Sequence, residues 1–339
     1  MRAVVMRELG PPSVLRVEEI PVPAIGPEEV LVKVGAVGVT YHDVVQRNGT
    51  MRRDTQLPIV LGYEIAGTVE RLGERVSGLK LGDRICTKAF HSCGMCRLCR
   101  NGMETACEKR RPVHGGYAEY AALPEEVCVV VPADMPLEVA CMLGPSTGVA
   151  LNAVRDTGKV RLGETVLVTG ASGGVGLPTI ELARSAGATV VALSRSQEKS
   201  AALHEAGAHH VIVADDGRDF SKDVRTLTDG NGVDVVIDNV GSRVFTPSFK
   251  SLSLGGRYVM VGQLVREDIS INPAFIFFKR AQILGVGSVR RDQLEDAVKL
   301  AASGRVRPRI AEVLPLEAAA DAHARVEAGA LVGRVVLRP

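Results

Sequence analysis

The stretch VLVTGASGGVG, residues 166–176, decides the fold of the second half of this chain. The apolar run 165–169 predicts a strand that is buried on both faces of a sheet, and a helix is expected to follow at 174–186. Gly173 allows the backbone to approach a pyrophosphate closely, and Gly176 lets the helix pack against the strand. Because the glycines lie between a strand and a helix, we interpret the stretch as a dinucleotide-binding turn. A glycine-rich turn without a ligand is the alternative.

Strands and helices are predicted to alternate around this stretch, as they do in a parallel sheet built from strand–helix–strand units. The predicted strands span residues 165–169, 189–193, 210–213, 233–238, 256–261 and 283–286, and the predicted helices span 174–186, 196–205, 219–228, 243–253 and 292–302. We therefore expect a doubly wound parallel sheet of about six strands over residues 133–271, completed by residues 282–303.

Residues 1–132 have a different character, because short strand-like segments are separated by glycine and proline turns. The segments 30–34 (VLVKV), 65–72 and 83–87 are typical of strands. We expect an all-β module here, a barrel with long loops. The tail 304–339 has strand–helix–strand character and is expected to return to this module. The chain as a whole is therefore predicted to be an α/β protein.

Length and composition limit the functions that the chain can have. Its 339 residues suggest about two domains, and 46% of them are hydrophobic. The formal net charge of +2, without a long basic block, argues against nucleic acid or an anionic membrane as the main partner. The N-terminal residues show no apolar signal segment, and no run approaches the roughly 20 apolar residues of a membrane span. We expect a soluble, cytoplasmic protein.

Four cysteines lie within the fifteen residues CGMCRLCRNGMETAC, 93–107. Their spacing is C-x2-C-x2-C-x7-C, and four thiolates so closely spaced predict a tetrahedral zinc site. A site closed by four cysteines leaves no open coordination position, so the zinc would be structural. Four unrelated thiols in a loop, a disulfide pair and an iron–sulfur cluster are the alternatives. The predicted ligands are Cys93, Cys96, Cys99 and Cys107.

The end of the second predicted strand of the sheet indicates which nucleotide binds. An acidic residue at this point would bind the ribose 2′-hydroxyl of NAD. The chain instead has Ser194, Arg195 and Ser196, with Lys199 one turn later. Two cations and two hydroxyls suit a 2′-phosphate, so we predict NADP(H). A solvated helix start is the alternative interpretation of Arg195 and Lys199.

With these features in place, nearly the whole chain resembles the medium-chain dehydrogenase/reductase superfamily, the group of the zinc-containing alcohol dehydrogenases. The matching segments besides the four cysteines are GVTYHD (38–43), LGYE (61–64), GDRI (82–85), GGYAEY (115–120), STG (146–148), GASGGVG (170–176) and DNVG (238–241). The resemblance implies a GroES-like catalytic domain over 1–132 with a structural-zinc lobe at 91–111, a Rossmann domain and a returning C-terminal segment.

The chain departs from this family at the catalytic zinc. Family members that carry this metal bind it with the Cys of a GVC segment, the His of a GHE motif and a Cys or carboxylate three residues before STG. The corresponding residues are Thr40, Tyr63 and Leu143, which cannot build a zinc site. We therefore expect no catalytic zinc. Without this Lewis acid, reduction of a plain carbonyl loses its main charge stabiliser.

Reduction of a carbon–carbon double bond conjugated to a carbonyl places less demand on the site, because the charge spreads into an enolate that hydrogen bonds stabilise. The resemblance thus implies the branch of quinone oxidoreductases and acryloyl-CoA reductases. The expected activity is NADPH-dependent reduction of an enoyl thioester, enone, enal or quinone, with hydride added to the β-carbon. A zinc-independent alcohol dehydrogenase or carbonyl reductase is one alternative, and a weakly catalytic NADPH-binding structural or sensor protein is the other.

Three residues are candidates for the chemistry. Tyr63 is expected to face the reacting carbon and to donate a hydrogen bond or a proton, although it could simply fill the space of the missing zinc. His42 is a possible proton donor or a polar residue near the ribose. Thr40 is expected to bind cofactor or substrate, with packing as its alternative role.

The resemblance also implies the cofactor contacts, and an exposed strand edge predicts a homo-oligomer. The predicted cofactor-binding residues are Thr147, Ser172, Gly173, Gly174, Val175, Ser194, Arg195, Lys199, Asn239, Gly262 and Arg334. The predicted strand at 282–287 would be an exposed sheet edge that can pair with its twofold mate, with the apolar run 273–278 covering the interface. We expect a homodimer or homotetramer that acts on a small electrophilic molecule.

Overall fold

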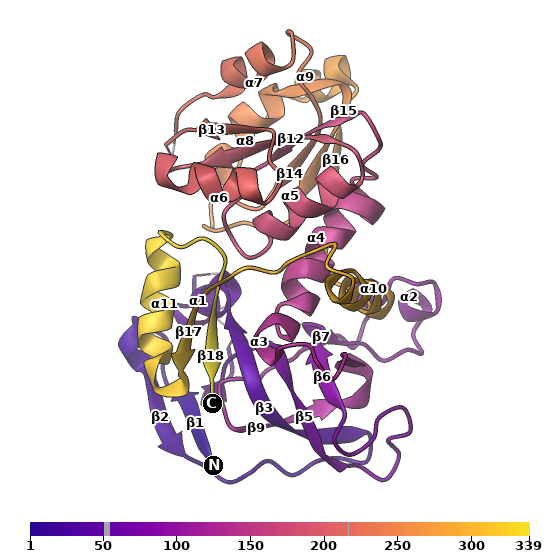
Figure 1. Ribbon diagram of the computed structural model, residues 1–339, viewed down its shortest axis with the longest axis vertical. Helices are drawn as coiled ribbons and strands as arrows, with labels where there is room; N and C mark the ends of the chain where they lie inside the picture. Colours follow the sequence, from indigo (N-terminus) through magenta and orange to yellow (C-terminus); the bar gives the residue numbers. More distant parts are fainter. Residues whose placement is uncertain (51–54, 216) are drawn as a thin grey trace. The chain divides into compact units, whose positions relative to one another are not determined.

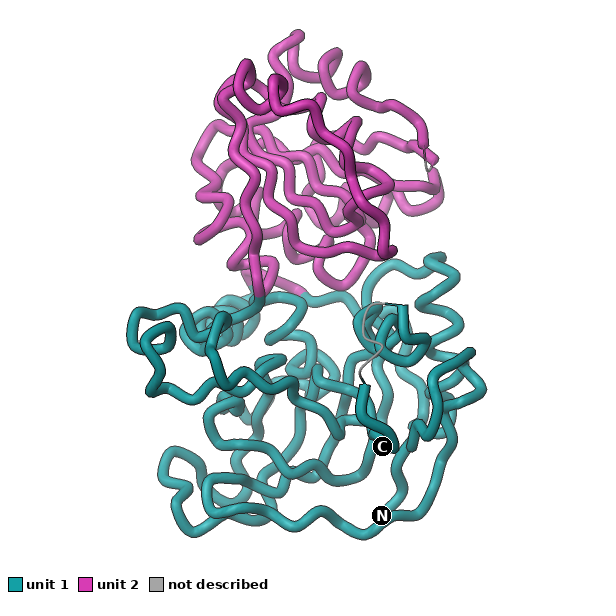
Figure 2. Tube along the Cα trace, turned by 180° about the vertical axis from the view of Figure 1, so that it is seen from behind, with its two compact units in different colours: residues 1–148, 288–304, 308–339 teal, residues 149–287, 305–307 magenta. Residues whose placement is uncertain are grey.

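A computed structural model describes residues 1–50, 55–215 and 217–339 of the chain. The chain divides into two compact units, shown in Figure 2. Unit 1 comprises Met1–Gly148, Ser288–Gly304 and Pro308–Pro339, and unit 2 comprises Val149–Gly287 and Arg305–Arg307.

Unit 2 contains the predicted six-stranded parallel sheet, with the strand order β13-β12-β11-β14-β15-β16 (Figure 1). Its strands are β11 (Thr165–Val168), β12 (Thr189–Ser194), β13 (His210–Val213), β14 (Val233–Asp238), β15 (Leu252–Met260) and β16 (Gln282–Gly285). Val166, Leu167 and Val168 are all fully buried. The apolar run that opened the sequence argument is therefore a central strand covered on both faces, as parallel sheets require.

Helices follow the strands of unit 2 as predicted. They are α4 (Val149–Leu151), α5 (Gly176–Ser185), α6 (Ser200–Glu205), α7 (Ser221–Leu227), α8 (Ser242–Lys250) and α9 (Pro273–Lys279). Helix α8 packs on the sheet through Phe245 and Phe249, whose rings lie with that of Tyr258 in one cluster with centroids 4.8–6.2 Å apart. These aromatic rings form much of the core on that side of the sheet.

Unit 1 is mainly antiparallel β-structure, as the short turn-separated segments predicted. Its largest sheet has the order β10-β6-β5-β3-β18-β17, with β9 also paired to β3, and two smaller sheets have the orders β2-β1-β4 and β7-β8. The strands are β1 (Arg2–Met6), β2 (Leu15–Glu19), β3 (Glu29–Val39), β4 (Ile59–Val60), β5 (Glu64–Leu72), β6 (Arg84–Thr87), β7 (Phe90–His91), β8 (Arg111–Pro112), β9 (Tyr120–Pro124), β10 (Cys128–Val130), β17 (Ile310–Pro315) and β18 (Arg334–Arg338).

The C-terminal segment returns to the first module, as expected. Strand β18 pairs antiparallel with β3, with Val335 opposite Val39, and β17 pairs with β18 in parallel. The helices of unit 1 are α1 (Tyr41–Arg47), α2 (Arg97–Arg100), α3 (Leu137–Ala140), α10 (Arg291–Ala302) and α11 (Ala319–Ala328). The core of this unit thus draws on both ends of the chain.

The boundaries of the units differ from the predicted domain limits at three places, one of which is Arg305–Arg307, a part of the predicted C-terminal segment that lies in unit 2. Residues 133–148 belong to unit 1 and not to the nucleotide domain, and so does α10 within 288–304. The reason is packing: α10 buries Leu294, Ala297 and Val298, and it contacts the helical turn η4 (Leu143–Gly148), which itself contacts β5 and β6. Only β16 of the predicted 282–303 segment completes the parallel sheet.

One helical stretch of the described residues, Leu137–Thr157, is long and apolar enough to cross a membrane. Most of its apolar window is buried inside the protein. It is therefore explained as a core helix, which passes the same test of length and composition.

Candidate functional site

A chain of hydrogen bonds joins Tyr63, Thr40 and Asp43 in unit 1. Thr40 is the N-cap of α1, and its Oγ1 accepts the backbone N–H of Asp43 at 3.2 Å, while Asp43 Oδ2 accepts the backbone N–H of Thr40 at 2.9 Å. This capping box fixes both side chains. Thr40 Oγ1 also lies 2.7 Å from Asp43 Oδ2 and 2.9 Å from Tyr63 Oη. Three polar side chains therefore meet at one hydroxyl oxygen, and all three are buried.

The structure brings the three predicted catalytic residues together. The ring of His42, the second residue of α1, meets the ring of Tyr63 edge-on with centroids 4.9 Å apart. Tyr63 directly precedes β5, and Thr40 directly follows β3. Because β3 and β5 pair along most of their length, residues 23 positions apart in the sequence reach hydrogen-bonding distance.

Burial controls the protonation of this group. Burial raises the pKa of Tyr63, and the carboxyl groups of Asp43 and Glu64 raise it further, so the phenol keeps its proton at neutral pH. Burial also raises the pKa of Asp43 to about 6, although hydrogen bonds from Thr40 act in the opposite direction. A carboxyl with a pKa near 6 can exchange a proton in the neutral range.

Glu64 and Arg334 form a buried ion pair beside this group. Arg334 opens β18, and its Nε lies 3.1 Å from Glu64 Oε2 while its Nη2 donates to Oε1 at 3.1 Å. Ser146 Oγ donates to Glu64 Oε1 at 2.5 Å and accepts from Arg334. The guanidinium that we predicted to reach the cofactor phosphates is thus bonded to protein groups here, and its contact with a cofactor stays a prediction.

The three residues at the expected catalytic-zinc positions offer a poor ligand set. Leu143 is fully buried and has no donor atom. The hydroxyls of Thr40 and Tyr63 are hydrogen-bonded to each other, whereas zinc in proteins prefers thiolate, imidazole and carboxylate. The chemistry of these side chains fits a hydrogen-bonding site better than a metal site.

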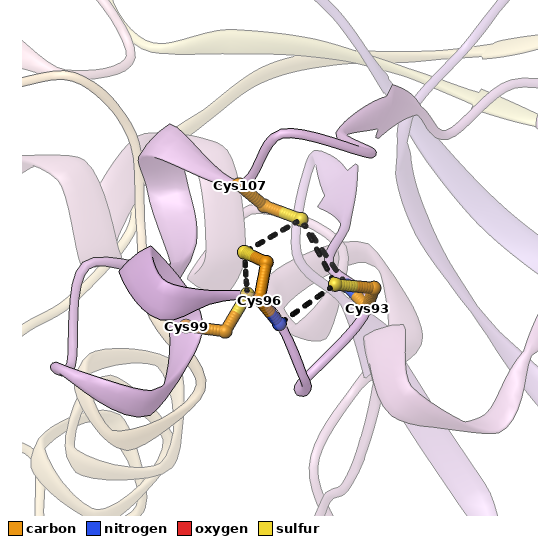
Figure 3. A group of neighbouring side chains, drawn as sticks. All are labelled: Cys93, Cys96, Cys99 and Cys107. Carbon is orange, nitrogen blue, oxygen red and sulfur yellow. Dashed lines mark hydrogen bonds between the residues drawn. The ribbon is translucent and has the colours of Figure 1, made fainter.

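The four predicted cysteine ligands do converge (Figure 3). Their sulfur atoms all lie within 4.8 Å of one another. Neighbouring sulfurs are 3.5 Å apart for Cys96 and Cys99, 4.0 Å for Cys96 and Cys107, and 3.5 Å for Cys107 and Cys93. A regular tetrahedron with Zn–S bonds of about 2.3 Å has edges of about 3.8 Å. Backbone N–H groups of Cys99 and Glu108 lower the pKa of Cys96 to about 6, which favours the thiolate that a metal requires.

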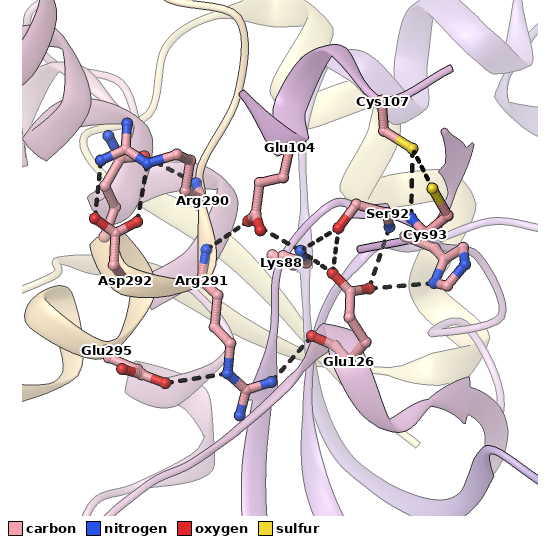
Figure 4. Close-up of polar contacts among 12 residues, drawn as sticks. Lys88, Ser92, Cys93, Glu104, Cys107, Glu126, Arg290, Arg291, Asp292 and Glu295 are labelled. Atoms are coloured by element: carbon pink, nitrogen blue, oxygen red, sulfur yellow. Dashed lines mark hydrogen bonds and ion pairs between the residues drawn. The ribbon is translucent and has the colours of Figure 1, made fainter. Parts of the chain in front are cut away.

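A buried network of charges fastens this cysteine lobe to the rest of unit 1 (Figure 4). Lys88, which follows β6, is almost fully buried and donates to Glu104 Oε1 at 3.0 Å and to Ser92 Oγ at 3.2 Å. It also pairs with Glu126. Glu104 Oε1 accepts the backbone N–H of Arg291 at the start of α10, at 2.7 Å. A residue between the third and fourth cysteines is therefore tied to both β6 and α10.

The glycine-rich turn of unit 2 has the geometry of a phosphate-binding turn. Ser172, Gly173, Gly174 and Val175 connect β11 to α5, and Gly173 donates its N–H to the carbonyl of Gly170 at 3.1 Å. A methyl group at Gly176 would clash with the carbonyl oxygens of Gly170 and Ala171. Only glycine fits there, so the start of α5 lies close against the turn.

Predicted 2′-phosphate ligands lie beside this turn. Lys199 Nζ reaches Ser172 Oγ at 3.4 Å, and its pKa is lowered by burial and by the nearby charge of Arg195. Ser194 ends β12 and donates to the carbonyl of Ser196 at 2.9 Å. Two cations that repel each other next to hydroxyl groups suit an anionic ligand.

Asn239 is held at the carboxyl end of β14 by a buried carboxylate. Asp238 accepts from Thr169 Oγ1 at 2.6 Å and from Tyr258 Oη at 2.7 Å, and it also accepts backbone N–H groups of Val240 and Gly241. Asn239 Nδ2 donates to the carbonyl of Thr169 at 2.8 Å. The bond to Thr169 orients the side-chain amide of Asn239 and leaves its side-chain oxygen, Oδ1, for another partner.

Two residues among the predicted cofactor ligands, one in each unit, carry a buried polar atom without a protein partner. Within the described residues, Asn239 Oδ1 and Thr147 Oγ1 have no hydrogen-bond partner. A Cβ at Gly262 would lie only 3.3 Å from the backbone carbonyl oxygen of Asn239, so glycine lets the backbone pack closely against Asn239 at this point. Buried polar atoms normally find partners, and the residues present therefore fit the predicted dinucleotide.

Sequence reasoning missed a second buried polar group. His323, on α11, is fully buried. Its Nδ1 lies 3.2 Å from Arg47 Nη1 and its Nε2 lies 3.0 Å from Tyr117 Oη, while Arg47 also pairs with Glu327 at 2.7 Å. Asp43 was not among the predicted catalytic residues, although the pattern Thr-x-x-Asp at 40–43 is a capping-box signal.

Two family models match the chain. The model described as zinc-binding dehydrogenase covers residues 174–303, and the alcohol dehydrogenase GroES-like domain covers residues 26–133. An acryloyl-coenzyme A reductase of Sulfurisphaera tokodaii is 34% identical over 344 residues, which is 100% of both chains. A quinone oxidoreductase of Rattus norvegicus is 33% identical over 99% of this chain and 97% of the relative.

Solved structures agree with this relationship. The crystal structure of AibC has a TM-score of 0.93 and 44% identity, with 100% of this chain and 96% of that chain covered. An NAD-dependent alcohol dehydrogenase superposes with a TM-score of 0.95 and 34% identity over the full length of both chains. Full-length relatives above 30% identity and two matching domain models show that the chain belongs to the medium-chain dehydrogenase/reductase superfamily of oxidoreductases.

Proposed function

We propose that this oxidoreductase is an NADPH-dependent reductase of activated alkenes that works without a catalytic zinc. The observation that carries the proposal is the hydrogen-bonded group of Tyr63, Thr40 and Asp43 at the expected zinc position. Its donors suit a developing enolate, whose charge is already spread over several atoms. The relatives named acryloyl-coenzyme A reductase and quinone oxidoreductase support this direction.

The roles of the residues follow from this chemistry. Bound NADPH supplies a hydride to the β-carbon of the substrate. Tyr63 then provides the proton that forms the new C–H bond at the α-carbon. Its raised pKa keeps the phenol protonated until the substrate becomes basic enough to take the proton. The partly exposed ring of His42 lies against Tyr63 and keeps the phenol in place.

We assign the nucleotide to the turn of unit 2 and its 2′-phosphate to Ser194, Arg195 and Lys199. The closeness of Lys199 to Ser172 supports this assignment, since it places a cation beside the turn that would hold the pyrophosphate. A solved relative, a zinc-binding dehydrogenase of Sinorhizobium meliloti, was crystallised with NADP. Asn239, Gly262 and Thr147 would serve the nicotinamide half.

A single structural zinc on Cys93, Cys96, Cys99 and Cys107 completes the proposed holoenzyme. Four thiolates leave no place for a substrate, so the metal braces the lobe and does not take part in the reaction. None of the seven cysteines, all of which lie in the described residues, forms a disulfide. This agrees with a protein of the reducing cytoplasm, which is the location that we propose.

We also propose that the protein is a homodimer or homotetramer. Within the described residues, β16 pairs with β15 alone and presents its other edge. Phe277, Phe278 and Ile283 are exposed on and before this strand, at 73%, 72% and 40%. An open edge with exposed aromatic side chains is a typical pairing surface. Small-angle scattering that showed a strict monomer would exclude this arrangement.

A second candidate function is supported by other relatives. Proteins named NAD-dependent alcohol dehydrogenase are 31–33% identical to the chain over its full length. Reduction of a simple carbonyl would need a group that takes over the role of the catalytic zinc. Of the residues at the three zinc positions, which are Thr40, Tyr63 and Leu143, Tyr63 alone offers a phenolic hydroxyl for this purpose. A protein that binds NADPH tightly but turns over no electrophile is the third possibility.

Steady-state assays separate these functions. The holoenzyme is incubated with NADPH or NADH and, in turn, crotonyl-CoA, an enal, a quinone and a simple ketone. The proposal expects turnover of at least one activated alkene or quinone, a preference for NADPH and negligible turnover of the ketone. Turnover of the ketone alone would support the carbonyl reductase, and tight NADPH binding without turnover would support the sensor.

A further inference from the structure

We infer that Asp43 and Thr40 form a two-state proton relay that supplies Tyr63 with the proton it gives to the substrate. The inference rests on the proposed function, because it assumes that Tyr63 is the proton donor. Asp43 and Thr40 do not touch the substrate in this scheme. They act through Tyr63, because they position and resupply the hydrogen of its hydroxyl group.

The hydrogen-bond inventory of Thr40 Oγ1 leaves just two arrangements. A hydroxyl has one hydrogen to donate and two lone pairs that accept. One lone pair is taken by the backbone N–H of Asp43 at 3.2 Å. One hydrogen and one lone pair therefore remain for two neighbours, Asp43 Oδ2 at 2.7 Å and Tyr63 Oη at 2.9 Å. Thr40 must donate to one of them and accept from the other.

The protonation of Asp43 selects between these arrangements. An ionised Asp43 can only accept, so Thr40 donates to it and Tyr63 donates its hydroxyl hydrogen to Thr40. In this state the hydrogen of Tyr63 points away from a substrate. When Asp43 is protonated, it donates to Thr40, Thr40 donates to Tyr63 Oη, and the hydroxyl hydrogen of Tyr63 is available to the substrate.

The proton step balances through this chain. The O–H bond of Tyr63 breaks as its proton moves to the α-carbon of the enolate, whose electron pair forms the new C–H bond. The hydrogen of Thr40 moves to Tyr63 Oη, the proton of Asp43 Oδ2 moves to Thr40 Oγ1, and Asp43 becomes a carboxylate. After product leaves, a proton from solvent enters at Tyr63 and the same movements in reverse return a proton to Asp43.

The surroundings suit a proton store. The titratable and charged groups around Asp43 are Tyr63, Glu64, Tyr117, Arg334 and the partly exposed His42. Glu64 forms its own ion pair with Arg334. Asp43 is therefore the carboxyl group that exchanges a proton with the hydroxyls of Thr40 and Tyr63. The pKa of Asp43, about 6, allows both states near neutral pH.

The test uses the full-length holoenzyme and the variants Y63F, T40V, T40S and D43N. Infrared difference spectra against pH follow the carboxylic-acid band that D43N removes, and they give the titration midpoint of Asp43 without any substrate. Hydrogen bonds to a charged group are strong enough to move such a midpoint by about 1–2 pH units. We expect a rise of this size in T40V, a smaller rise in Y63F and a midpoint close to wild type in T40S.

The Y63F result distinguishes a relay from simple helix capping. Capping alone leaves the Asp43 midpoint unchanged when the hydroxyl of Tyr63 is removed, and that result would overturn the inference whatever the substrate is. In the kinetic arm, kcat of wild type with crotonyl-CoA or the best alkene of the panel should fall as pH rises through the midpoint. T40V should lose on the order of 10²-fold in kcat, lose this pH dependence and keep its KM for NADPH, with T40S restoring both properties.

The two arms separate the inference from the proposed function. If no alkene or quinone is turned over, the proposed function fails, and the infrared midpoints still decide whether the three side chains are coupled. If alkenes are reduced but T40V keeps the wild-type pH profile, the relay is wrong and the proposed function stands.

Discussion

Replacing Arg334 by methionine should expose the dependence of unit 1 on one buried ion pair. Glu64 is fully buried, and the Arg334 side chain is 11% exposed. Removing one partner of such a pair costs about 3–5 kcal/mol, because the remaining charge stays buried. Because the Arg334 side chain is partly exposed to solvent, we take the lower end of this energy range. We expect R334M to lose about 3 kcal/mol in the free energy of unfolding at pH 8. This is a large part of the roughly 5–15 kcal/mol that stabilises a typical domain.

The loss should depend on pH with a definite sign. Burial already raises the pKa of folded Glu64, and Arg334 lowers it. R334M removes the lowering influence, so the folded pKa rises further above the unfolded value. Between those two values the folded state binds more protons, and its stability falls as pH rises. The deficit of R334M should therefore be larger at pH 8 than at pH 5.

Urea unfolding followed by circular dichroism measures both effects. The matched control is R325M, which removes an arginine from the exposed pair with Glu312 in the same unit and should cost less than about 1 kcal/mol. Adding E64Q to R334M removes the stranded charge and should recover much of the loss. An R334M deficit that is equal at pH 5 and pH 8 and unaffected by E64Q would show that the buried charge of Glu64 is not the cause.

Three further predictions concern the other sites. Elemental analysis should find one zinc per chain, and two zincs per chain would contradict the proposed site. The variant C96S should lose the metal and have a lower melting temperature, because structural zinc binding is coupled to folding. R195A should raise the KM for NADPH by about tenfold, the effect of losing roughly 1.4 kcal/mol, and leave the KM for NADH nearly unchanged; equal effects on both cofactors would show that Arg195 does not bind the 2′-phosphate. Burial lowers the pKa of His323 from 6.5 to about 3, so below pH 6.5 the unfolded state binds a proton that the folded state does not. The free energy of unfolding of the wild type should therefore fall by up to about 1.4 kcal/mol per pH unit. A similar slope in H323Q would show that His323 is not responsible.

The sheet of unit 2 could be predicted closely because its signal is local. Strands β13 and β14 have the predicted bounds, because a short apolar run between turn residues is a local signal for a strand. The four cysteines were equally local, with every ligand inside fifteen residues. Both features depend on spacing along the chain and not on contacts between distant segments.

The candidate site could be predicted only in part, because its decisive contacts join distant segments. Glu64 and Arg334 are 270 positions apart, and nothing in either local sequence shows that they pair. His323 lies on an amphipathic helix whose apolar face gave no sign of the buried Arg47 and Tyr117. The placement of α10 in unit 1 has the same cause, since its partner is the helical turn Leu143–Gly148. Tyr63 and Thr40 were found because a family motif marks both positions.

The position of the transferred hydride distinguishes reduction of an alkene from reduction of a carbonyl. The holoenzyme is given NADPH with deuterium at both C4 positions and a small α,β-unsaturated ketone, which offers an activated alkene and a carbonyl in one molecule. The product is then examined by NMR. An alkene reductase yields a saturated ketone with deuterium on the β-carbon, which is the result we expect. An unsaturated alcohol with deuterium on the carbonyl carbon would show that the protein reduces carbonyls instead.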